Sequence, residues 1–381
     1  MFTRKDLQRF QAEPLEDKRQ RSLAKVSEWY CYWKNAVYVA FSGGLDSTVL
    51  ADICAIWCSL ANCTLYLVFA DTGLEYPEIR KHVKEFAEYL RNKYNIEVVL
   101  DIVRPKMRFD EVIKTHGYPL ISKEVSNTIR LARANIKDGK YSHRLCKLGV
   151  KAEDYNLYDS GKYDYEKALE NSKFKLPKWK PLIDLDCDIS EECCNIMKKE
   201  PMREYTEQTG RMPLIATRAE ESMNRENAWF KNGCNAFDSD DPKSTPMAFW
   251  LKQDVLWYIK EEKLPICSVY GDIIFEIEPD QLRIGDMDAW FADNKENLCT
   301  TGADRTGCMF CSFGCHKEGK DGKPNRFQRD KITHPKQYKY YIGGGEYNED
   351  GKWQPNKQGL GMGHIFDELN ETYGEDFINY E

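Results

Sequence analysis

The residues most able to do chemistry stand together in the segment Ser42-Gly43-Gly44-Leu45-Asp46-Ser47-Thr48. An apolar run at 37–41 precedes this segment, and residues 46–60 have a helical composition, so a strand should turn into a helix here. Such a turn presents backbone N–H groups and a helix N-terminus, which bind phosphate. Glycines allow close backbone approach, and the Ser42, Ser47 and Thr48 hydroxyls can donate to phosphate oxygens. The segment lacks both the Gly-Lys-Ser/Thr of a P-loop NTPase and the third glycine of a dinucleotide fingerprint.

Charged residues follow two other predicted strands. Asp71 comes directly after the apolar run at 64–70, which puts a carboxylate at the strand edge beside the glycine-containing turn. Arg218 and Arg225 follow the strand expected at 212–217. Their two guanidiniums could clamp a phosphate or a sulfate bidentately. The sequence therefore predicts an anion site built from several strand ends.

Cysteines form the second group of reactive residues. Cys193 and Cys194 are adjacent in a predicted helix, and Cys308 and Cys311 lie in a glycine-flanked Cys-x-x-Cys turn. Adjacent cysteines are awkward ligands for one tetrahedral ion because their side chains diverge, whereas an iron–sulfur cubane tolerates that divergence. The short spacings also permit a rival zinc site formed by Cys299, Cys308, Cys311 and Cys315.

The composition favours a globular protein that handles small molecules. The formal charge is −7 with a pI near 5.6, so the chain as a whole does not attract nucleic acid or anionic lipid. We expect no membrane association, because no stretch approaches the about 20 apolar residues of a membrane helix. The start of the chain shows no apolar signal core, so we expect a cytoplasmic protein whose 14 cysteines are reduced thiols, metal ligands or catalytic groups.

Strand-like and helical segments alternate through the first part of the chain, which predicts an α/β fold: a doubly wound, mostly parallel sheet with helices on both faces. Strands are predicted at 37–41, 64–70, 96–103 and 212–217, and helices at 17–33, 46–60, 76–94, 120–136, 189–199, 202–209 and 248–262.

We expect three regions along the chain. Residues 1–35 form an N-terminal helical extension. Residues 36–265 form the nucleotide-binding α/β domain, with an irregular insertion at about 137–181. Residues 266–381 form a C-terminal cysteine-rich helical and loop region that packs on the nucleotide site.

Several of these strings resemble known motifs. Residues 42–48 resemble the Ser-Gly-Gly-x-Asp-Ser motif of the ATP-pyrophosphatase, or PP-loop, superfamily, whose fold is described as adenine nucleotide alpha hydrolase-like. Residues 71–78 resemble the Asp-Thr-Gly-x-x-x-Pro-Glu string of the phosphoadenosine-phosphosulfate reductase family, and residues 215–225 resemble its arginine loop. The likeness runs from about 37 to 317, and its combination of motifs resembles reductase-like proteins common in phages and gut bacteria.

The resemblance implies an adenine nucleotide, ATP or an adenylated sulfate, held by Ser42, Gly43, Gly44, Asp46, Ser47, Thr48, Asp71 and Arg218. It also implies that Asp46 organises a metal, expected to be Mg²⁺, or the loop itself, with Arg218 and Arg225 acting on the anion. The set Cys193, Cys194, Cys308 and Cys311 resembles the ligands of a [4Fe-4S] cluster in adenylyl-sulfate reductases. Reductases of the family carry a further cysteine in a Glu-Cys-Gly-x-His context near the C-terminus; Cys315-His316 is its nearest counterpart here.

Three functions remain open. The favoured hypothesis is cleavage of ATP between its α and β phosphates, which adenylates an acceptor that then receives sulfur, with a thiol or sulfur-donor protein as a candidate partner. The second is reduction of adenylyl-sulfate or phosphoadenylyl-sulfate, in which Cys315 or another thiol attacks sulfur and sulfite is released. The third is a nucleotide-sensing or nucleic-acid-modifying module in phage defence, with Lys198-Lys199, 173–180 and 326–331 as a basic surface for tRNA or DNA.

Overall fold

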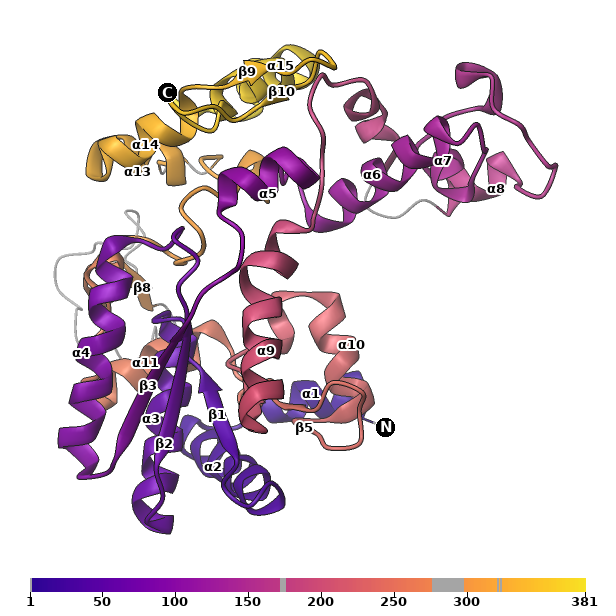
Figure 1. The fold of residues 1–381 in the computed structure, drawn as a ribbon. Helices are drawn as coiled ribbons and strands as arrows, with labels where there is room; N and C mark the ends of the chain where they lie inside the picture. Colours follow the sequence, from indigo (N-terminus) through magenta and orange to yellow (C-terminus); the bar gives the residue numbers. More distant parts are fainter. Residues whose placement is uncertain (1, 172–175, 276–297, 321, 323) are drawn as a thin grey trace, which may run out of the picture. The chain divides into compact units, whose positions relative to one another are not determined.

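The computed structural model describes residues 2–171, 176–275, 298–320, 322 and 324–381. The chain divides into two units, each assembled from segments that are not consecutive (Figure 1). Unit 1 comprises Met1–Asp71, Glu75–Pro105 and Glu200–Gly307, and unit 2 comprises Thr72–Leu74, Lys106–Lys199 and Cys308–Glu381. The regions expected from the sequence were consecutive ranges, which describe a different division of the chain.

Unit 1 is built on a six-stranded sheet with the order β3-β2-β1-β4-β6-β5. All pairings are parallel except that of β5 with β6. In β1, Val39 pairs with Leu67 of β2 on one side and with Leu214 of β4 on the other. The order of the strands therefore reverses at β1, which makes the carboxyl end of β1 the topological switch point where open α/β sheets bind ligands. The strands of unit 1 are β1 (Val37–Ala40), β2 (Leu65–Ala70), β3 (Val98–Val103), β4 (Met212–Leu214), β5 (Asn235–Ala236), β6 (Lys243–Ser244) and a separate antiparallel pair, β7 (Ile273–Phe275) and β8 (Leu298–Thr300).

Helices cover this sheet and confirm the doubly wound α/β prediction. The helices of unit 1 are α1 (Arg4–Gln11), α2 (Leu15–Tyr32), α3 (Leu45–Ala61), α4 (Pro77–Tyr94), α9 (Glu200–Thr209), α10 (Met223–Asn232) and α11 (Lys252–Glu262). Helix α3 packs on β1 and β2, and α9 packs on β2 and β3. The Tyr38 side chain of β1 points toward α9, where its hydroxyl lies 3.2 Å from Thr206 Oγ1.

A buried carboxylate fixes α3, the helix that follows the glycine-containing turn. The Asp52 side chain is completely buried and accepts hydrogen bonds from Lys93 at 3.1 Å, Tyr94 at 2.9 Å and Tyr258 at 2.8 Å. These donors come from α4, the end of α4 and α11, so one charge ties three helices together. Burial raises the pKa of Asp52, while the positive charge of Lys93 and the hydroxyl donors oppose that shift.

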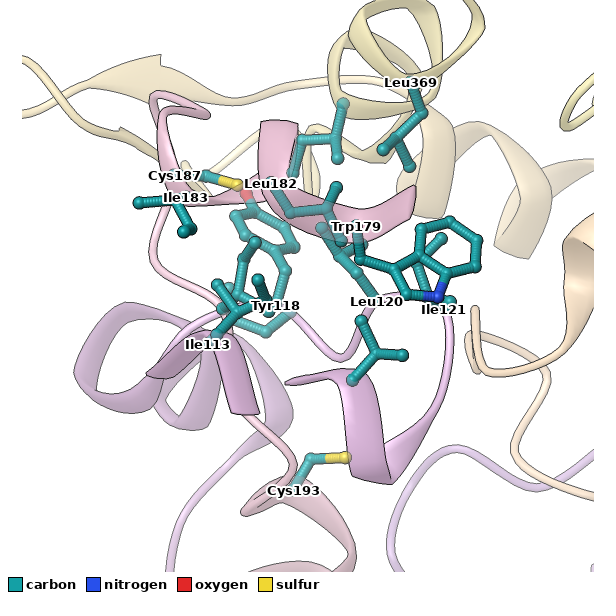
Figure 2. Packing of buried hydrophobic residues seen from close by; sticks show 14 of the residues in the cluster. Ile113, Tyr118, Leu120, Ile121, Trp179, Leu182, Ile183, Cys187, Cys193 and Leu369 are labelled. Carbon is teal, nitrogen blue, oxygen red and sulfur yellow. The ribbon is translucent and has the colours of Figure 1, made fainter. Parts of the chain in front are cut away.

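Unit 2 is mainly helical. Its α-helices are α5 (Phe109–His116), α6 (Lys123–Lys137), α7 (His143–Lys147), α8 (Tyr165–Glu170), α13 (Arg326–Thr333), α14 (Pro335–Ile342) and α15 (Met362–Tyr373), and β9 (Glu346–Tyr347) pairs with β10 (Trp353–Gln354). Figure 2 shows its apolar core, in which Tyr118 and Leu120 meet Trp179, Leu182 and Cys187. Residues of the irregular insertion expected at 137–181, among them Trp179, contribute to this core. The described helices include none that is long and apolar enough to cross a membrane.

Candidate functional site

Residues 42–48, which we call the glycine loop, join β1 to α3 at the switch point of the sheet. Gly43 is buried and has a φ of +71°, and a Cβ atom at this position would lie 3.0 Å from Val83 Cγ2. Only glycine fits both the backbone conformation and the contact. The Ser47 hydroxyl donates to the Gly44 carbonyl at 2.9 Å and accepts from the Ser42 N–H at 3.2 Å. Ser47 therefore shapes the loop, and the Ser42 hydroxyl also contacts it, lying 3.1 Å from Ser47 Oγ and accepting from the Gly44 N–H at 3.4 Å.

Arginines converge on this loop from the neighbouring strand end. Arg218 follows β4 and is only 8% exposed, and its Nε lies 2.6 Å from Asp46 Oδ1. These two atoms are buried but are not aligned as a hydrogen bond. Arg225, on α10, is close enough to Arg305, Asp46 and Arg218 for their charges to act on it. Burial is the main cause of its lowered pKa, and repulsion from Arg305 is the next.

Three guanidiniums around one glycine loop make a site for an anion with several negative charges. The arginines are held by carboxylates: Arg218 pairs with Glu220, Arg225 pairs with Glu221, and Arg305 lies 3.7 Å from Glu221. The structure therefore brings together Asp46, Arg218 and Arg225, as the sequence predicted. Arg305 joins them without having been assigned a role.

Two hydroxyl side chains that the sequence analysis missed also lie over the loop. The Leu45 N–H, at the first turn of α3, donates to the Tyr270 hydroxyl at 3.4 Å, and that hydroxyl lies 2.5 Å from Thr306 Oγ1. Tyr270 ends a short 3₁₀ helix, Ser268–Tyr270, where no sequence pattern pointed to a ligand. Thr306 lies beside Arg305, within the range of about 37–317 that resembles the family. That resemblance was the one signal in the sequence that could have pointed to Thr306.

Asp71 and Thr48 differ from their predicted surroundings. Asp71 lies at the same sheet edge as the loop, because β2 pairs with β1, but its carboxylate contacts Arg80 at 2.9 Å and Arg104 at 3.4 Å. Thr48 is 1% exposed, and its buried hydroxyl has no hydrogen-bond partner among the described residues. Their proposed contacts with phosphate or metal stay predictions.

Unit 2 holds the four cysteines of the predicted cluster on a single pocket, which we call the cysteine pocket. Its volume is about 320 Å³ with its open mouth included. It is lined by Cys193, Cys194, Cys308 and Cys311, by the apolar side chains Leu74, Phe109, Pro119, Met197 and Phe310, and by Lys198. Cys193 and Cys194 directly precede a π-helical turn, Asn195–Lys199, in place of the regular helix predicted at 189–199. Such turns are frequent at functional sites.

The Cys308–Cys311 turn is held by backbone contacts within unit 2. The Met309 N–H donates to the Leu74 carbonyl at 2.8 Å, and Arg326 donates to the Cys311 carbonyl at 2.8 Å. Beyond the turn, the Gly314 N–H donates to the Ile121 carbonyl at 2.9 Å. Ile121 has a φ of +64°, which a β-branched residue rarely adopts, so the surrounding contacts hold strained backbone next to the pocket.

Positive charge at the pocket favours thiolates. A hydrogen bond with Cys193 lowers the pKa of Cys194, and the ammonium groups of Lys123 and Lys198 lower it further against the effect of burial. The same hydrogen bond, together with burial, raises the pKa of Cys193. Burial is also the main cause of the raised pKa of Cys311. The surroundings of the pocket therefore lower the pKa of Cys194 and raise those of Cys193 and Cys311.

The spacing of the cysteine sulfurs in the described residues does not match a single zinc ion. Thiolates around one tetrahedral zinc ion lie about 3.8 Å apart, because each Zn–S bond is about 2.3 Å. Within the described parts of the chain, no three cysteine sulfurs lie within 4.8 Å of one another. Cys315, a member of the rival zinc set, is 2% exposed, and its Sγ contacts the Ser312 carbonyl at 2.9 Å. Burial raises the pKa of Cys315 to about 12, which also makes it a poor nucleophile.

The basic residues considered for nucleic acid have internal contacts. Lys198 lines the cysteine pocket, Lys180 pairs with Asp154 at 2.8 Å, and Arg326 pairs with Glu318. Residues 172–175, part of the predicted basic stretch, lie outside the described residues. A nucleic-acid surface therefore stays a prediction.

Comparison with protein-family models gives a match to the phosphoadenosine phosphosulfate reductase domain over residues 36–136 and 150–317, more than two thirds of the chain. The match includes the glycine loop, the arginine segment and all four cysteines of the pocket. A search of the curated proteins gave no match.

Proposed function

This chain belongs to the phosphoadenosine phosphosulfate reductase domain family, and from that premise we propose that it binds ATP at the glycine loop and cleaves it between the α and β phosphates. An oxygen of the acceptor would attack the α-phosphorus, and pyrophosphate would leave. Sulfide from a sulfur donor would then attack the adenylated atom of the acceptor, form the new bond to sulfur and displace AMP. The observation that carries this proposal is the convergence of Arg218 and Arg225 with Asp46 on a glycine loop at the N-terminus of α3.

The glycine loop and the side chains around it have distinct roles in this proposal. The N-terminus of α3 and the Ser42 hydroxyl hold the phosphates, while Arg218 and Arg225 neutralise the charge that develops on the leaving pyrophosphate. Asp46 would hold Mg²⁺, because Mg²⁺ is usually held by one or two carboxylates together with phosphate oxygens, and its Oδ1 would exchange Arg218, 2.6 Å away, for the metal. The Tyr270 and Thr306 hydroxyls position the first turn of α3.

The cysteine pocket fits a [4Fe-4S] cluster. It offers four thiols, an apolar lining and a lysine beside the sulfurs, which suits a group that carries net negative charge. Cys193, Cys194, Cys308 and Cys311 would be its ligands. A cluster bound there would supply redox capacity or polarise a bound sulfur group. Lys198 would balance its charge, and the Arg326 contact would keep the Cys311 backbone in place.

Reduction of an adenylated sulfate is the second candidate, and the four-cysteine pocket is the observation that favours it. Its mechanism needs an exposed thiolate to attack sulfur. Cys315 does not meet that need, because it is buried and its pKa is raised. We therefore rank adenylation first.

Anaerobically purified protein should slowly release AMP and pyrophosphate from ATP in the presence of Mg²⁺, with water taking the place of the acceptor oxygen. Arg218→Ala should lose this activity, while Arg203→Ala, an exposed arginine on α9, should keep it. Thiol-dependent sulfite release from an adenylated sulfate, without pyrophosphate release from ATP, would replace adenylation with the reductase alternative. Binding of neither nucleotide would reject both.

A further inference from the structure

A second group of ligating side chains lies in unit 2 and has no part in either site described above. Asp186 follows the 3₁₀ helix Leu176–Ile183, and His364 and Glu368 stand one helical turn apart on α15. In the described ranges of the chain this is the one set of at least three His, Cys, Asp or Glu side chains whose ligand atoms lie within 4.8 Å of one another. From this geometry we propose that the three residues bind a divalent transition-metal ion.

The distances fit an ion better than they fit a hydrogen-bonded triad. His364 Nε2 lies 3.4 Å from Asp186 Oδ2 and 3.3 Å from Glu368 Oε1. Ligand atoms placed about 2.1 Å from a tetrahedral ion are about 3.4 Å apart. Charge-assisted hydrogen bonds between nitrogen and a carboxylate are shorter, at about 2.7–2.9 Å. A cation between these atoms accounts for the spacing.

The second oxygen atoms of the Asp186 and Glu368 carboxylates also support a bound metal ion. Asp186 Oδ1 and Glu368 Oε2 are buried, and neither accepts a geometrically formed hydrogen bond from another described residue. Two carboxylates side by side with buried unpaired oxygens repel each other, and one imidazolium would leave a net negative charge. A divalent ion balances both carboxylates. The Tyr347 hydroxyl, 3.3 Å from His364 Nε2, stands where a fourth ligand or a bound water would complete the site.

The site is also built into the backbone. The Trp353 N–H donates to the Asp186 carbonyl at 2.7 Å, and the Trp353 ring lies against the His364 ring with centroids 4.1 Å apart. Trp353 therefore holds ligands from two distant parts of the chain in one place. A metal here would fasten α15 to the segment that leads to Cys193, which is a structural role. One histidine and two carboxylates suit Zn²⁺ or Mn²⁺.

Mn²⁺ is a more selective probe of this site than Zn²⁺. Thiolates select softer metals, so the cysteine pocket should not bind Mn²⁺. Protein treated with a chelator and free of nucleotide is titrated with Mn²⁺, and free Mn²⁺ is counted by electron paramagnetic resonance. We expect one ion per chain and a rise in melting temperature on binding. Glu368→Gln and His364→Ala should each weaken binding at least tenfold and abolish the thermal shift. Glu166→Gln, an exposed carboxylate of α8 in the same unit, should change neither.

The isosteric Glu368→Gln keeps the test valid if His364→Ala does not fold. Equal Mn²⁺ binding in the wild type and Glu368→Gln would overturn the proposal. Absence of Mn²⁺ binding in the wild type would also overturn it and would leave the trio as a hydrogen-bonded group of side chains. Because no nucleotide is used, either result leaves the function proposed for the glycine loop untouched.

Discussion

Gly43→Ala should damage the glycine loop in a way that the structure allows to be quantified. At a φ of +71°, an alanine costs about 1–2 kcal/mol in backbone strain. Its Cβ would lie 3.0 Å from Val83 Cγ2 and 3.2 Å from Ile79 Cγ2, and both of these α4 side chains are buried. Crowding of this kind adds about 1–3 kcal/mol. After an entropic gain of about 0.4–1 kcal/mol from stiffening the unfolded chain, we expect a net loss of about 1–5 kcal/mol.

Gly210→Ala is the matched control. Gly210 has a φ of +68° and belongs to the same unit, but a Cβ there would meet nothing within 4 Å. It should therefore lose only about 1 kcal/mol through backbone strain. Urea unfolding followed by circular dichroism compares the two free energies of unfolding. Titration with ATP and Mg²⁺ by calorimetry should show at least a tenfold weaker affinity for Gly43→Ala and no change for Gly210→Ala.

Either of two outcomes for these variants would contradict the prediction. If both variants lose the same free energy of unfolding and bind ATP equally well, the contact with Val83 does not constrain the loop. If Gly43→Ala is destabilised as expected but binds ATP like the wild type, the close backbone approach is a packing feature and not part of a phosphate site.

Other predictions concern both units. Asp52→Ala should cost about 1–3 kcal/mol in urea unfolding, because it leaves the buried Tyr258 hydroxyl without its acceptor, and Asp52→Asn should cost less. Cys315→Ser should keep the iron content of anaerobically prepared protein, whereas Cys308→Ser should lower it severalfold, because only Cys308 lines the pocket. Burial alone would raise the pKa of Glu318, but hydrogen bonds and the charge of Arg326 outweigh it and place the pKa below 4.5. This pair's contribution to stability is therefore complete above pH 4.5 and is lost as the pH falls through the lower folded pKa, and Glu318→Gln should remove that part of the acid sensitivity.

Patterns of apolar and polar residues predicted those helices and strands that are long enough for such a pattern to show. The apolar run before Ser42 became β1, and the helix expected at 76–94 is α4, with Pro77 at its first position. Strands β5 and β6 have two residues each, too few for any periodicity to show. The helix predicted at 189–199 failed for a different reason. A π-helical turn at 195–199 keeps Ile196 and Met197 buried, as a regular helix would, so the apolar pattern does not distinguish the two.

The remaining residues of the candidate sites are brought together by tertiary contacts, which local sequence patterns do not predict. Motifs identified the residues within the glycine loop, because they are consecutive in the chain. Tyr270 reaches the Leu45 N–H from 225 residues away, and no local pattern encodes that contact. The trio on α15 is an intermediate case. The spacing of His364 and Glu368 places both on one face of a helix and could have suggested a ligand pair, but Asp186 is 178 residues distant and only the folded chain supplies it.

Charge pairing explains why residue type alone gave an incomplete account of the anion site. The sequence predicted arginines that clamp phosphate, but Arg218 lies against Asp46 and Glu220, and Arg225 pairs with Glu221. A phosphate must therefore compete with carboxylates for the guanidiniums, and each carboxylate that it displaces must find another positive partner. Mg²⁺ beside Asp46 would provide one such partner. The affinity for a nucleotide at this loop then depends on the exchange of ion pairs and not on the number of arginines, so the acidic residues of the loop belong to the binding site as much as the basic ones do.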